Sequence, residues 1–473
     1  MENKKFGSNF AKDDIFFLDK IADFGDKTAL ISDQEELDYQ GLDTAAKKIT
    51  EGIEQRSFVF LVCTNCMACI VGYIGFLQKR IVPVLLNSSI DKDLYNELIE
   101  NYKPQYIWCP EDFVPQAGTF LYKGYKLIVT EETALEMDDR LALLLTTSGS
   151  TGSPKFVRQS YRNIQANTES IVEYLQIKKE DRAITTLPMS YTYGLSIIQS
   201  HLMAGAEIIL TEQTFFDRGF WNFFREKKAT TFGAVPYTYQ MLDRLHFFRM
   251  ELPSLRYITQ AGGRLGEELH NKFASGMREK GKEFIVMYGA TEATARMSYV
   301  PANQSVEKAG SIGIAIPGGT FELVDVDGSI IDEDNKVGEL IYYGDNVTMG
   351  YAENREDLAL GDQRGSRLET GDMAKRDKDG YYYVTGRKKR FLKVYGNRVN
   401  LAELEELLKR AGYESACVGE DDHISIYTTN SDPSAAIDFI SEKTGLNRAA
   451  FTAVSIDKIP RNDSGKVLYS KLI

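Results

Sequence analysis

Short apolar segments alternate with segments that have the pattern of helices over much of the chain. Apolar segments at 57–62 and 81–86 flank a helix predicted over 66–78. Four more apolar segments, each followed by a predicted helix, lie at 183–187, 206–210, 230–235 and 255–259. Strands without polar alternation, separated by helices, are typical of parallel sheets covered on both faces. The sequence therefore predicts an α/β fold built from parallel-rich subdomains.

The pattern changes after residue 320. Short strands, a DG turn and glycines over 321–344 predict antiparallel sheet, and 377–394 predicts another hairpin. A helix beginning at about 401, strands near 414–428 and 449–456, and a helix near 433–445 form a small α+β unit. We place a domain boundary at about 388. The predicted domains are a large one, 1–387, which ends in a small antiparallel barrel-like subdomain, and a small C-terminal one, 388–473.

Charge and hydropathy exclude several classes of protein. The chain has 473 residues and a net charge of -12, which disfavours nucleic acid and anionic membranes as main partners. No apolar stretch reaches the roughly 20 residues that span a bilayer, and the N-terminus lacks the apolar core of a secretory signal. We expect a cytoplasmic enzyme without a membrane span.

Five cysteines in a chain of this length are few and odd in number, which favours a reducing compartment. Cys63, Cys66 and Cys69 have the CxxCxxC spacing of part of an iron–sulfur motif. The segment has no nearby fourth cysteine, and its apolar context predicts a strand followed by a buried helix. We therefore interpret these cysteines as small buried side chains.

The segment TTSGSTGSPK (146–155) presents many small donors before one lysine, Lys155. It lies between the apolar strand LALLL and a helix predicted to begin near Tyr161, and such strand–loop–helix positions bind ligands in open parallel sheets. It is not a Walker A loop, because Lys155 is followed by Phe156 and not by Ser or Thr. Phosphate binding is favoured over a generic glycine-rich loop.

Three further segments carry residues suited to a nucleotide. Tyr288 of MYGATEA offers a flat face for a purine, and Glu292 offers a hard carboxylate for Mg²⁺. Asp372, after Gly371, has the chemistry to accept hydrogen bonds from two ribose hydroxyls. Arg387 and Lys393 are cations near the predicted domain junction, and Lys466 lies in a Pro/Asn/Asp/Ser/Gly loop near the C-terminus. Taken singly, each has a structural explanation as well.

Taken together, these segments resemble the superfamily of adenylate-forming enzymes, which comprises acyl-CoA synthetases, peptide-synthetase adenylation domains and firefly-type luciferases. The resemblance runs from about residue 25 to the C-terminus. Nine segments match family motifs in order: TTSGSTGSPK, LPMSYTYGL, AGGRL, YGATE, GSIGIAIPG, GELIYYGDNVTMGY, TGD, GR followed by K and GNR, and PRNDSGK. Nine matches in order make coincidence a poor explanation.

The resemblance implies a role for each matching residue. It assigns the β- and γ-phosphates of ATP to Thr147, Ser148, Gly149, Ser150, Thr151 and Lys155. Tyr288 would pack on adenine, with Gly262 and Gly263 lining the adenine or acyl side. Thr291 would contact the α-phosphate, Glu292 the magnesium ion, Asp372 the ribose, and Arg387 the ribose or phosphate. Lys466 would bridge the substrate carboxylate and the nucleotide, and Lys393 would lie on the cofactor side.

The implied reaction has two halves. ATP and Mg²⁺ activate a carboxylic acid to an acyl-adenylate with release of pyrophosphate, and a thiol of CoA or of a phosphopantetheinyl carrier then takes the acyl group. In thioester-forming members the small domain rotates about a hinge, here Lys389, which withdraws Lys466 and brings in the GNR segment.

The chain departs from the family at the acyl side. Tyr191 stands where many acyl-CoA synthetases carry histidine, and Thr192 stands where amino-acid-activating members carry aspartate. A plain carboxylic acid is therefore favoured over an amino acid. Tyr191, Tyr193, Val235 and Pro236 are expected to line its pocket, whose aromatic character suits an aryl or medium acyl group.

Two alternatives stay open. One is a stand-alone adenylation enzyme that loads a carrier protein with an amino or aryl acid. The other is a nucleotide-binding homologue without catalysis, against which the presence of Glu292, Asp372, Arg387 and Lys466 argues.

Overall fold

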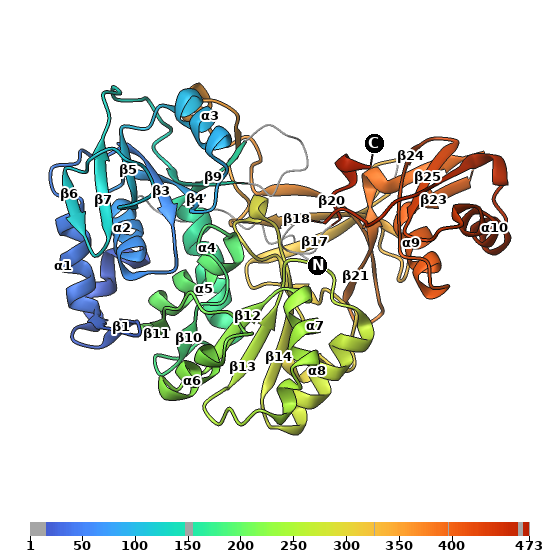
Figure 1. Cartoon of the computed structure of the whole chain (residues 1–473), viewed down its shortest axis with the longest axis horizontal. Coiled ribbons are helices and arrows are strands. Elements are labelled where there is room, and N and C mark those ends of the chain that lie inside the picture. Colours follow the sequence, from blue (N-terminus) through green and yellow to red (C-terminus); the bar gives the residue numbers. More distant parts are fainter. Residues whose placement is uncertain (1–15, 147–154, 326, 396, 462–466, 473) are drawn as a thin grey trace, which may run out of the picture. The chain divides into compact units, whose positions relative to one another are not determined.

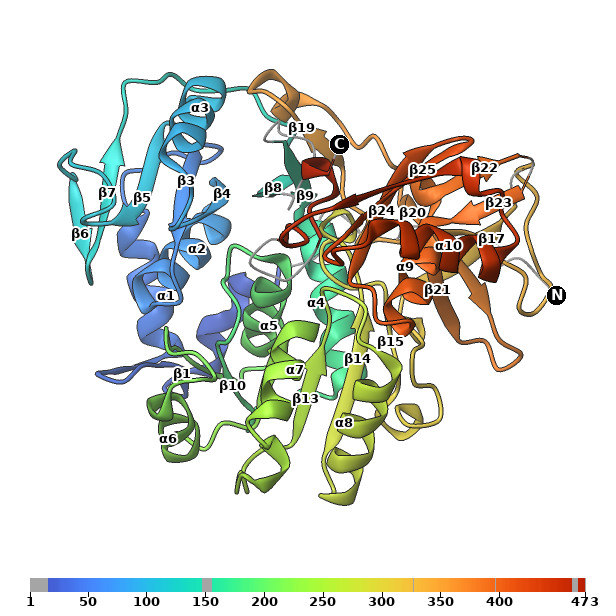
Figure 2. The ribbon, with the colours of Figure 1, turned by 45° about the vertical axis from the view of Figure 1, so that its right-hand side comes forward.

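The structure, a computed structural model, describes residues 16–146, 155–325, 327–395, 397–461 and 467–472, and it leaves out the side chains of 389, 391, 393, 397, 398 and 400. The chain divides into two compact units. The first contains residues up to 146, 155–232 and 348–363; the second contains 233–347 and 364 onward. Figures 1 and 2 show the elements of each unit.

The first unit contains an eight-stranded sheet in the order β19-β9-β8-β4-β3-β5-β7-β6. Its strands are β3 (Phe58–Cys63), β4 (Val82–Asn87), β5 (Tyr106–Pro110), β6 (Phe120–Tyr122), β7 (Tyr125–Val129), β8 (Leu141–Thr146), β9 (Phe156–Ser160) and β19 (Gly350–Ala352). The central pairs, β3 with β4 and β5 and β4 with β8, are parallel, whereas the edge pairs are antiparallel. The predicted parallel-rich subdomain is confirmed.

Helix α2 (Met67–Gln78) packs in the hydrophobic core beside this sheet. Every residue from Met67 to Leu77 is buried, as expected of a helix that is apolar all round. The indole of Trp108 on β5 donates to the Ala68 carbonyl at 3.0 Å. A Cβ at Gly72 would lie 2.5 Å from that indole nitrogen, so only glycine allows the helix and Trp108 to approach this closely.

One buried cation helps to hold the segment 348–363, which contains β19, in the first unit. Arg158 on β9 is fully buried. Its guanidinium donates to the carbonyls of Tyr351 (2.9 Å) and Met349 (3.2 Å) and to Oε1 of Gln363 (2.9 Å). The sequence analysis gave no role to Arg158. A buried guanidinium needs several acceptors, and this segment supplies them.

The position of the Ser/Thr/Gly segment differs from the prediction. Strand β8 is followed not by a helix but by β9, which pairs antiparallel with β8, and helix α4 (Tyr161–Leu175) begins only after β9. The strand–loop–helix expectation is therefore wrong, although the helix does start at Tyr161. All five residues of β9 are buried. Burial in the sheet stabilises a strand at 156–160, where the sequence predicted that the loop runs directly into the helix.

A second set of strands in the first unit is also parallel at its centre. The order is β10 (Arg182–Ile184), β11 (Glu207–Ile209), β1 (Thr28–Ile31) and β2 (Glu36–Asp38), with only β1 and β2 antiparallel. The first unit also contains helices α1 (Tyr39–Ile49), α3 (Lys92–Tyr102), α5 (Thr192–Met203) and α6 (Arg218–Glu226).

The second unit begins with a parallel pair and continues in antiparallel sheet. Strands β13 (Tyr257–Gln260) and β14 (Glu283–Tyr288) are parallel, and α7 (Pro236–Arg244) and α8 (Glu267–Glu279) lie alongside them (Figures 1 and 2). The neighbour of β13 is β12 (Thr231–Ala234), and β15 (Ser298–Tyr299) and β16 (Ile314–Ala315) follow β14. The four-stranded antiparallel sheet contains β17 (Gly319–Val324), β18 (Gly338–Gly344), β20 (Arg367–Arg376) and β21 (Tyr382–Arg387). The antiparallel sheet predicted over 321–344 is confirmed. The hairpin predicted over 377–394 is wrong, because β21 pairs with β20 and the next strand, 391–394, pairs with 397–400.

The C-terminal residues have their own core. They contain the hairpin β22 (Phe391–Val394) and β23 (Asn397–Asn400), the sheet β24 (Ser415–Glu420), β25 (His423–Thr428) and β26 (Phe451–Ser455), and helices α9 (Leu401–Arg410) and α10 (Pro433–Thr444). One cluster of buried residues extends from Leu392 to Phe451 and contains no residue before 392. This cluster supports our proposal of a separate domain from about 388.

None of the helices in the described part of the chain is both long enough and apolar enough to cross a membrane.

One buried histidine in the second unit couples stability to pH. His270 on α8 is 1% exposed. Its Nδ1 accepts the Gly310 N–H at 3.2 Å, so Nε2 carries the proton and contacts the Ser305 hydroxyl at 3.2 Å. Burial lowers the pKa of His270 to about 4, because the imidazolium would lose its hydration and the Gly310 donor would face a second donor.

We predict that the second unit loses stability as the pH falls from about 6.5 to about 4. In that range the unfolded chain binds a proton at His270 and the folded chain does not, so protons favour unfolding. The contribution amounts to about 3 kcal/mol at most. Urea unfolding at several pH values should show a smaller acid sensitivity for His270→Gln than for wild type. The exposed His423→Gln is the control, and equal sensitivity of all three proteins would contradict the prediction.

Candidate functional site

A buried carboxylate, Asp372, is the centre of the candidate site in the second unit. Asp372 on β20 is 5% exposed and pairs in register with Arg387 on β21. The Tyr288 hydroxyl donates to Oδ2 of Asp372 at 2.5 Å, and Nε of Arg387 lies 2.7 Å from Oδ1. The structure thus brings together three residues that the sequence analysis assigned to one nucleotide.

The two donors differ in their surroundings. The Arg387 side chain is 63% exposed, so water screens much of its attraction to Asp372. Burial, and after it the negative charge of Asp372, raise the pKa of Tyr288 well above its ordinary value. Tyr288 therefore stays protonated and donates to Asp372 at neutral pH.

The turn that carries Thr291 and Glu292 follows Tyr288 directly. Both residues lie in the short helix η3 (Thr291–Ala293) and are partly exposed. The guanidinium of Arg364 contacts the Glu292 carbonyl at 3.4 Å. A Cβ at Gly289 would collide with the backbone carbonyl of Ala295, so the chain turns back on itself at a position where only glycine fits.

Asn346 holds this turn, and the sequence analysis missed it. Thr294 has φ 62, which is costly for a β-branched residue. Its hydroxyl donates to the Asn346 carbonyl at 2.7 Å, and the Asn346 amide donates to the carbonyls of Ala293 (2.9 Å) and Arg296 (2.8 Å). Asn346 lies within the motif GELIYYGDNVTMGY, but its partners are about 50 residues away in sequence. Only the folded chain reveals its role in shaping the turn.

Gly262 and Gly263 follow the carboxyl end of β13, as Tyr288 ends β14. Because these strands are parallel, both ends lie at one edge of the sheet. Gly262 has φ 84, and a Cβ at Gly263 would lie 3.2 Å from Cγ of Pro236. Val235 and Pro236 follow the neighbouring strand β12 and are partly exposed. Four predicted residues therefore share the edge with Tyr288.

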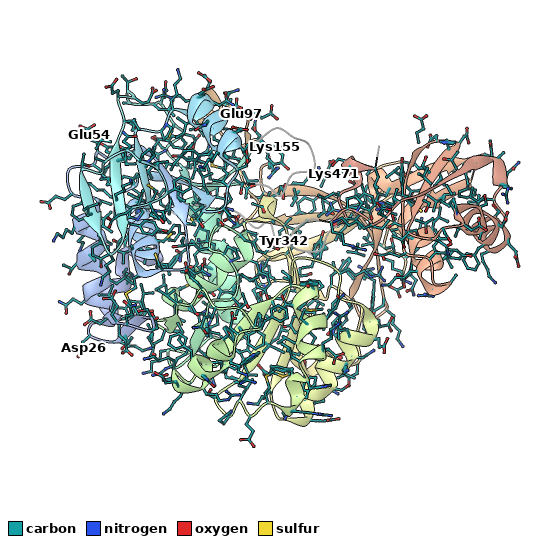
Figure 3. All side chains as sticks on the ribbon, viewed as in Figure 1. Asp26, Glu54, Glu97, Lys155, Tyr342 and Lys471 are labelled. Carbon is teal, nitrogen blue, oxygen red and sulfur yellow. The ribbon has the colours of Figure 1, made fainter. Side chains whose placement is uncertain are left out.

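Lys155, Tyr191 and Tyr193 belong to the first unit. The Lys155 ammonium lies 4.1 Å from the centre of the Tyr351 ring, which gives this cation (Figure 3) an aromatic partner. The rings of Tyr191 and Tyr193 are 6.3 Å apart. Tyr191 is partly exposed, whereas Tyr193 is 1% exposed and packs in the core.

Several predicted site residues lie outside the part of the chain that the structure describes. Thr147, Ser148, Gly149, Ser150, Thr151 and Lys466 are outside the described residues. The backbone of Lys389 lies in the short helix η6 (Lys388–Arg390) and that of Lys393 on β22, but their side chains are not described. The roles of all eight residues stay predictions.

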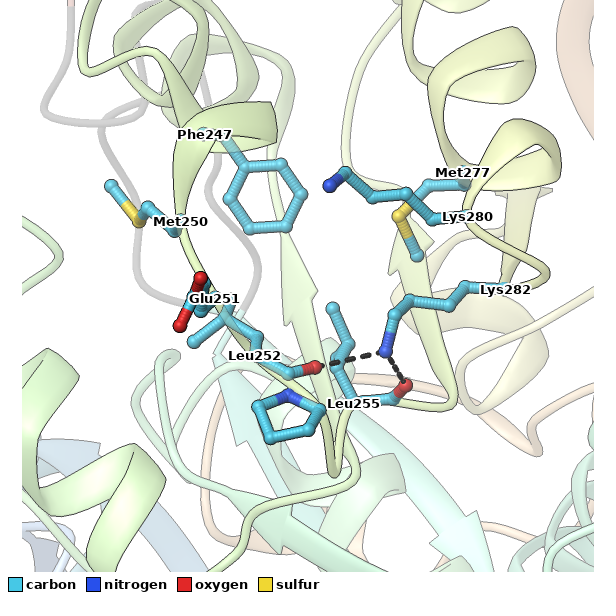
Figure 4. A pocket seen from close by; sticks show the side chains of 9 residues that line it. Phe247, Met250, Glu251, Leu252, Leu255, Met277, Lys280 and Lys282 are labelled. Atoms are coloured by element: carbon cyan, nitrogen blue, oxygen red, sulfur yellow. Dashed lines mark hydrogen bonds between the residues drawn. The ribbon is translucent and has the colours of Figure 1, made fainter.

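A pocket of about 390 Å³ lies at the opposite edge of the β13–β14 pair. Leu255 and Lys282, which precede these two strands, line it together with Phe247, Met250 and Met277 (Figure 4). The Lys282 ammonium donates to the carbonyls of Leu252 (2.8 Å) and Leu255 (2.5 Å). The Lys282 ammonium thus links the loop at 252–255 to the start of β14. Since Tyr288 ends β14 and Lys282 precedes it, this pocket is separate from the candidate site.

Tyr288, Gly262 and Gly263 thus lie at the carboxyl-end edge of a parallel pair, the place where α/β enzymes with open sheets bind their ligands. Comparison with known proteins agrees. The profile of the AMP-binding enzyme family matches residues 17–352. The chain therefore belongs to the AMP-binding enzyme family, within the adenylate-forming superfamily that its motifs resemble.

Curated relatives of this chain are CoA ligases. The chain is 28% identical over 489 residues to the indoleacetate–CoA ligase of Aromatoleum aromaticum, with 93% of each chain covered. It is 30% identical over 397 residues to the oxalate–CoA ligase of Arabidopsis thaliana, with 78% of this chain and 76% of that one covered.

The fold is that of a known synthetase. The o-succinylbenzoate CoA synthetase of Bacillus subtilis, solved in complex with an acyl-adenylate intermediate, superimposes with a TM-score of 0.76. The alignment covers 97% of this chain and 98% of that one at 22% identity. The expected fold class, a large α/β N-terminal part followed by a small α+β part, is confirmed.

We predict that Tyr288→Phe costs more stability than a tyrosine substitution of the same kind elsewhere in the unit. The hydroxyl of Tyr288 donates to a charged oxygen, so its loss should cost about 1.5–3 kcal/mol. Tyr342, whose hydroxyl donates to the neutral Asn346 amide oxygen at 2.8 Å (Figure 3), is the matched control. Tyr342→Phe should cost about 1 kcal/mol. Urea unfolding measures both, and a smaller loss at Tyr288 than at Tyr342 would overturn this interpretation.

Proposed function

We propose that this enzyme activates a carboxylic acid with ATP and transfers the acyl group to the thiol of CoA. In the first half-reaction a carboxylate oxygen of the acid bonds to the α-phosphorus of ATP. The bond between the α-phosphorus and the oxygen that bridges it to the β-phosphorus breaks, and pyrophosphate leaves with that oxygen. In the second, the thiol sulfur bonds to the acyl carbon, AMP leaves, and the thiol proton passes to solvent. The products are a thioester, AMP and pyrophosphate.

The observation that carries this proposal is the state of Asp372. Its Oδ2 accepts a hydrogen bond from Tyr288, and its Oδ1 lies 2.7 Å from Nε of Arg387. An ionised carboxylate only accepts hydrogen bonds, and its two oxygens offer about four lone-pair sites. Two neighbouring ribose hydroxyls are donors of the kind that such a group binds. The Tyr288 ring precedes Thr291 and Glu292 in one turn, which suits adenine and the α-phosphate.

The mutual repulsion of the two reactants sets what the other residues have to do. A carboxylate must approach a polyphosphate, and both are anions. We assign Lys155 and the segment 147–151 to the β- and γ-phosphates, and Lys466 to the oxyanions that react. Arg387 is mostly exposed and so is accessible to the ribose or phosphate.

Glu292 is the residue we assign to Mg²⁺. Its carboxylate is the hard oxygen donor that this ion prefers, and it lies on a turn fixed by Asn346 and Gly289. When bound, the ion would supply positive charge that neutralises the departing pyrophosphate. The synthetase of Bacillus subtilis with this fold has been solved with ATP and a magnesium ion.

An aromatic acid is the substrate class we favour. Thr192 does not offer the carboxylate that would hold an α-ammonium group, and Tyr191 supplies a partly exposed ring next to it. Among the relatives, indoleacetate–CoA ligase and 2-succinylbenzoate–CoA ligase are named for aromatic acids. CoA is favoured as acceptor, since these relatives are CoA ligases. A carrier protein with phosphopantetheine is the second candidate acceptor.

We further propose a cytoplasmic location. All five cysteines are free thiols, and burial raises the pKa of Cys66 above its ordinary value. Unpaired cysteines of low reactivity fit a reducing compartment.

We also retain the prediction that the small domain from about 388 rotates about Lys389 between the two half-reactions.

We predict that wild-type enzyme releases pyrophosphate from ATP in the presence of at least one acid from a panel of indoleacetate, 2-succinylbenzoate, benzoate, oxalate and hexanoate. Lys466→Ala should lower the rate about 100-fold or more, because it removes a preorganised cation from the reacting oxyanions. Lys471→Ala, an exposed lysine on the same tail, should keep the wild-type rate.

Running the panel with CoA, with a holo-carrier protein and with neither acceptor separates the acceptors by thioester formation. Absence of acid-dependent pyrophosphate release with every acid would favour the non-catalytic homologue and contradict this proposal.

We predict that Glu292→Gln raises the Mg²⁺ concentration needed for half-maximal pyrophosphate release at least about tenfold, because a neutral amide replaces a charged ligand. Titration of Mg²⁺ at saturating acid and ATP measures the shift. Glu267→Gln, an exposed glutamate on α8, is the matched control. An unchanged Mg²⁺ requirement in Glu292→Gln would remove this residue from the metal site.

A further inference from the structure

Three side chains from separate segments of the C-terminal region form one network, which we call the tail anchor: Arg390, Glu405 and Tyr469. Arg390 ends η6, Glu405 lies on α9, and Tyr469 begins η8 (Tyr469–Lys471). The Arg390 guanidinium donates to Oε1 of Glu405 at 2.7 Å, and the Tyr469 hydroxyl donates to Oε2 at 3.1 Å. The guanidinium carbon also lies 4.0 Å from the centre of the Tyr469 ring. Each member of the tail anchor therefore contacts the other two.

The backbone around Cys417 completes the tail anchor. The Cys417 N–H donates to Glu405 at 2.7 Å, and Arg390 donates to the Cys417 carbonyl at 3.2 Å. The side chains of Arg390 and Glu405 are only 16% and 17% exposed. Burial acts to lower the pKa of Arg390, but Glu405 and Tyr469 outweigh it and raise that pKa. The ion pair is thus shielded from water, and the Arg390 guanidinium stays charged.

The tail anchor adjoins a closed stem of the chain. Arg461 and Val467 form an antiparallel bridge, and the Leu468 N–H donates to the Pro460 carbonyl at 2.8 Å. The stem, 460–461 with 467–468, thus brackets residues 462–466, and Tyr469 follows it directly. Lys466 precedes Tyr469 by three positions in the sequence, which limits the distance between their Cα atoms to about 10 Å.

We propose that the tail anchor is a positioning device for adenylation: it fixes the stem next to Lys466 to the residue that follows the hinge. This inference rests on the proposed role of Lys466. Arg390 directly follows Lys389, the proposed hinge, so the tail anchor joins the two segments whose relative position matters for delivery of the lysine. Arg390, Glu405 and Tyr469 are positioning residues, since none of them is assigned to the reactants.

The chemistry of the tail anchor fits positioning better than stability alone. A buried ion pair is often no more stabilising than apolar residues of the same volume. Its directional bonds and the ring contact instead select one arrangement of the three segments. Small errors in the placement of a catalytic group cost large factors in rate. A loosened stem should therefore impair the step that needs Lys466 and spare the step from which Lys466 is withdrawn.

The test compares the two half-reactions in the full-length enzyme. Tyr469→Leu removes the hydroxyl and the ring contact, Tyr469→Phe removes only the hydroxyl, and Ser470→Ala is an exposed neighbouring control. Adenylation is measured as pyrophosphate release with the fastest acid of the panel above. Thioester formation is measured separately, from the chemically synthesised adenylate of that acid and CoA.

We expect the adenylation kcat to fall about 100-fold in Tyr469→Leu, to fall less in Tyr469→Phe, and to stay unchanged in Ser470→Ala. Thioester formation from the supplied adenylate should stay at the wild-type rate in all three. Arg390→Gln gives a second route to the same result if Tyr469→Leu does not fold, as judged by circular dichroism.

Four outcomes would overturn the proposal. Equal losses in both half-reactions would make the tail anchor a purely structural feature, and undiminished adenylation in folded Tyr469→Leu and Arg390→Gln would leave it without a positioning role. A wild-type adenylation rate in Lys466→Ala would refute the role of Lys466 and with it this inference. These three results leave the proposed function intact, whereas a wild-type enzyme without acid-dependent pyrophosphate release would refute the proposed function and this inference together.

Discussion

A carboxylate that is withdrawn from water has to be compensated by donors, and this requirement at Asp372 organises the second unit. Asp372 is 5% exposed and is held by one phenol and one guanidinium. This compensation requires the end of β14 to lie against the pair β20–β21. Strand β14 supplies Tyr288, and the pair supplies Arg387 and Asp372 itself. An isolated buried charge would instead be neutralised or would unfold its surroundings. The same carboxylate is the group that we assign to the ribose hydroxyls, so the structural requirement and the proposed site share one residue.

The backbone beside this carboxylate is held as firmly as the side chains. Thr294 has a positive φ of 62, and such strain persists only where the surroundings outweigh it. Asn346 supplies that support through bonds to both sides of the turn, and Tyr342 in turn orients Asn346. Glu292 is therefore presented from a rigid turn. Rigid presentation matters for a group that is proposed to hold a metal ion during charge transfer.

Electrostatics explain why the cations of this protein occur where they do. The chain carries a net charge of -12, yet its proposed substrates are themselves anions. Attraction must then come from local groups such as Arg387 and Lys155 and not from the overall field. The tail anchor follows the same logic at the C-terminus, where a shielded ion pair holds the stem beside Lys466. The effect of a cation on the rate of a reaction depends on its position relative to the reacting atoms.

The sequence by itself determined the parallel α/β core, the antiparallel sheet over 321–344 and the family, because apolar periodicity and motif chemistry are local properties. The nucleotide-site residues that it indicates stay predictions. The structure decided what depends on partners far apart in the chain. Examples are the insertion of β9 between the Ser/Thr/Gly segment and α4, the capture of segment 348–363 by Arg158, the support of Thr294 by Asn346, and the tail anchor. In the last three of these, polar groups with little exposure have their partners on segments distant in sequence, which hydropathy or spacing along one segment does not indicate. In the first, pairing with β8 decided that residues 156–160 form a strand.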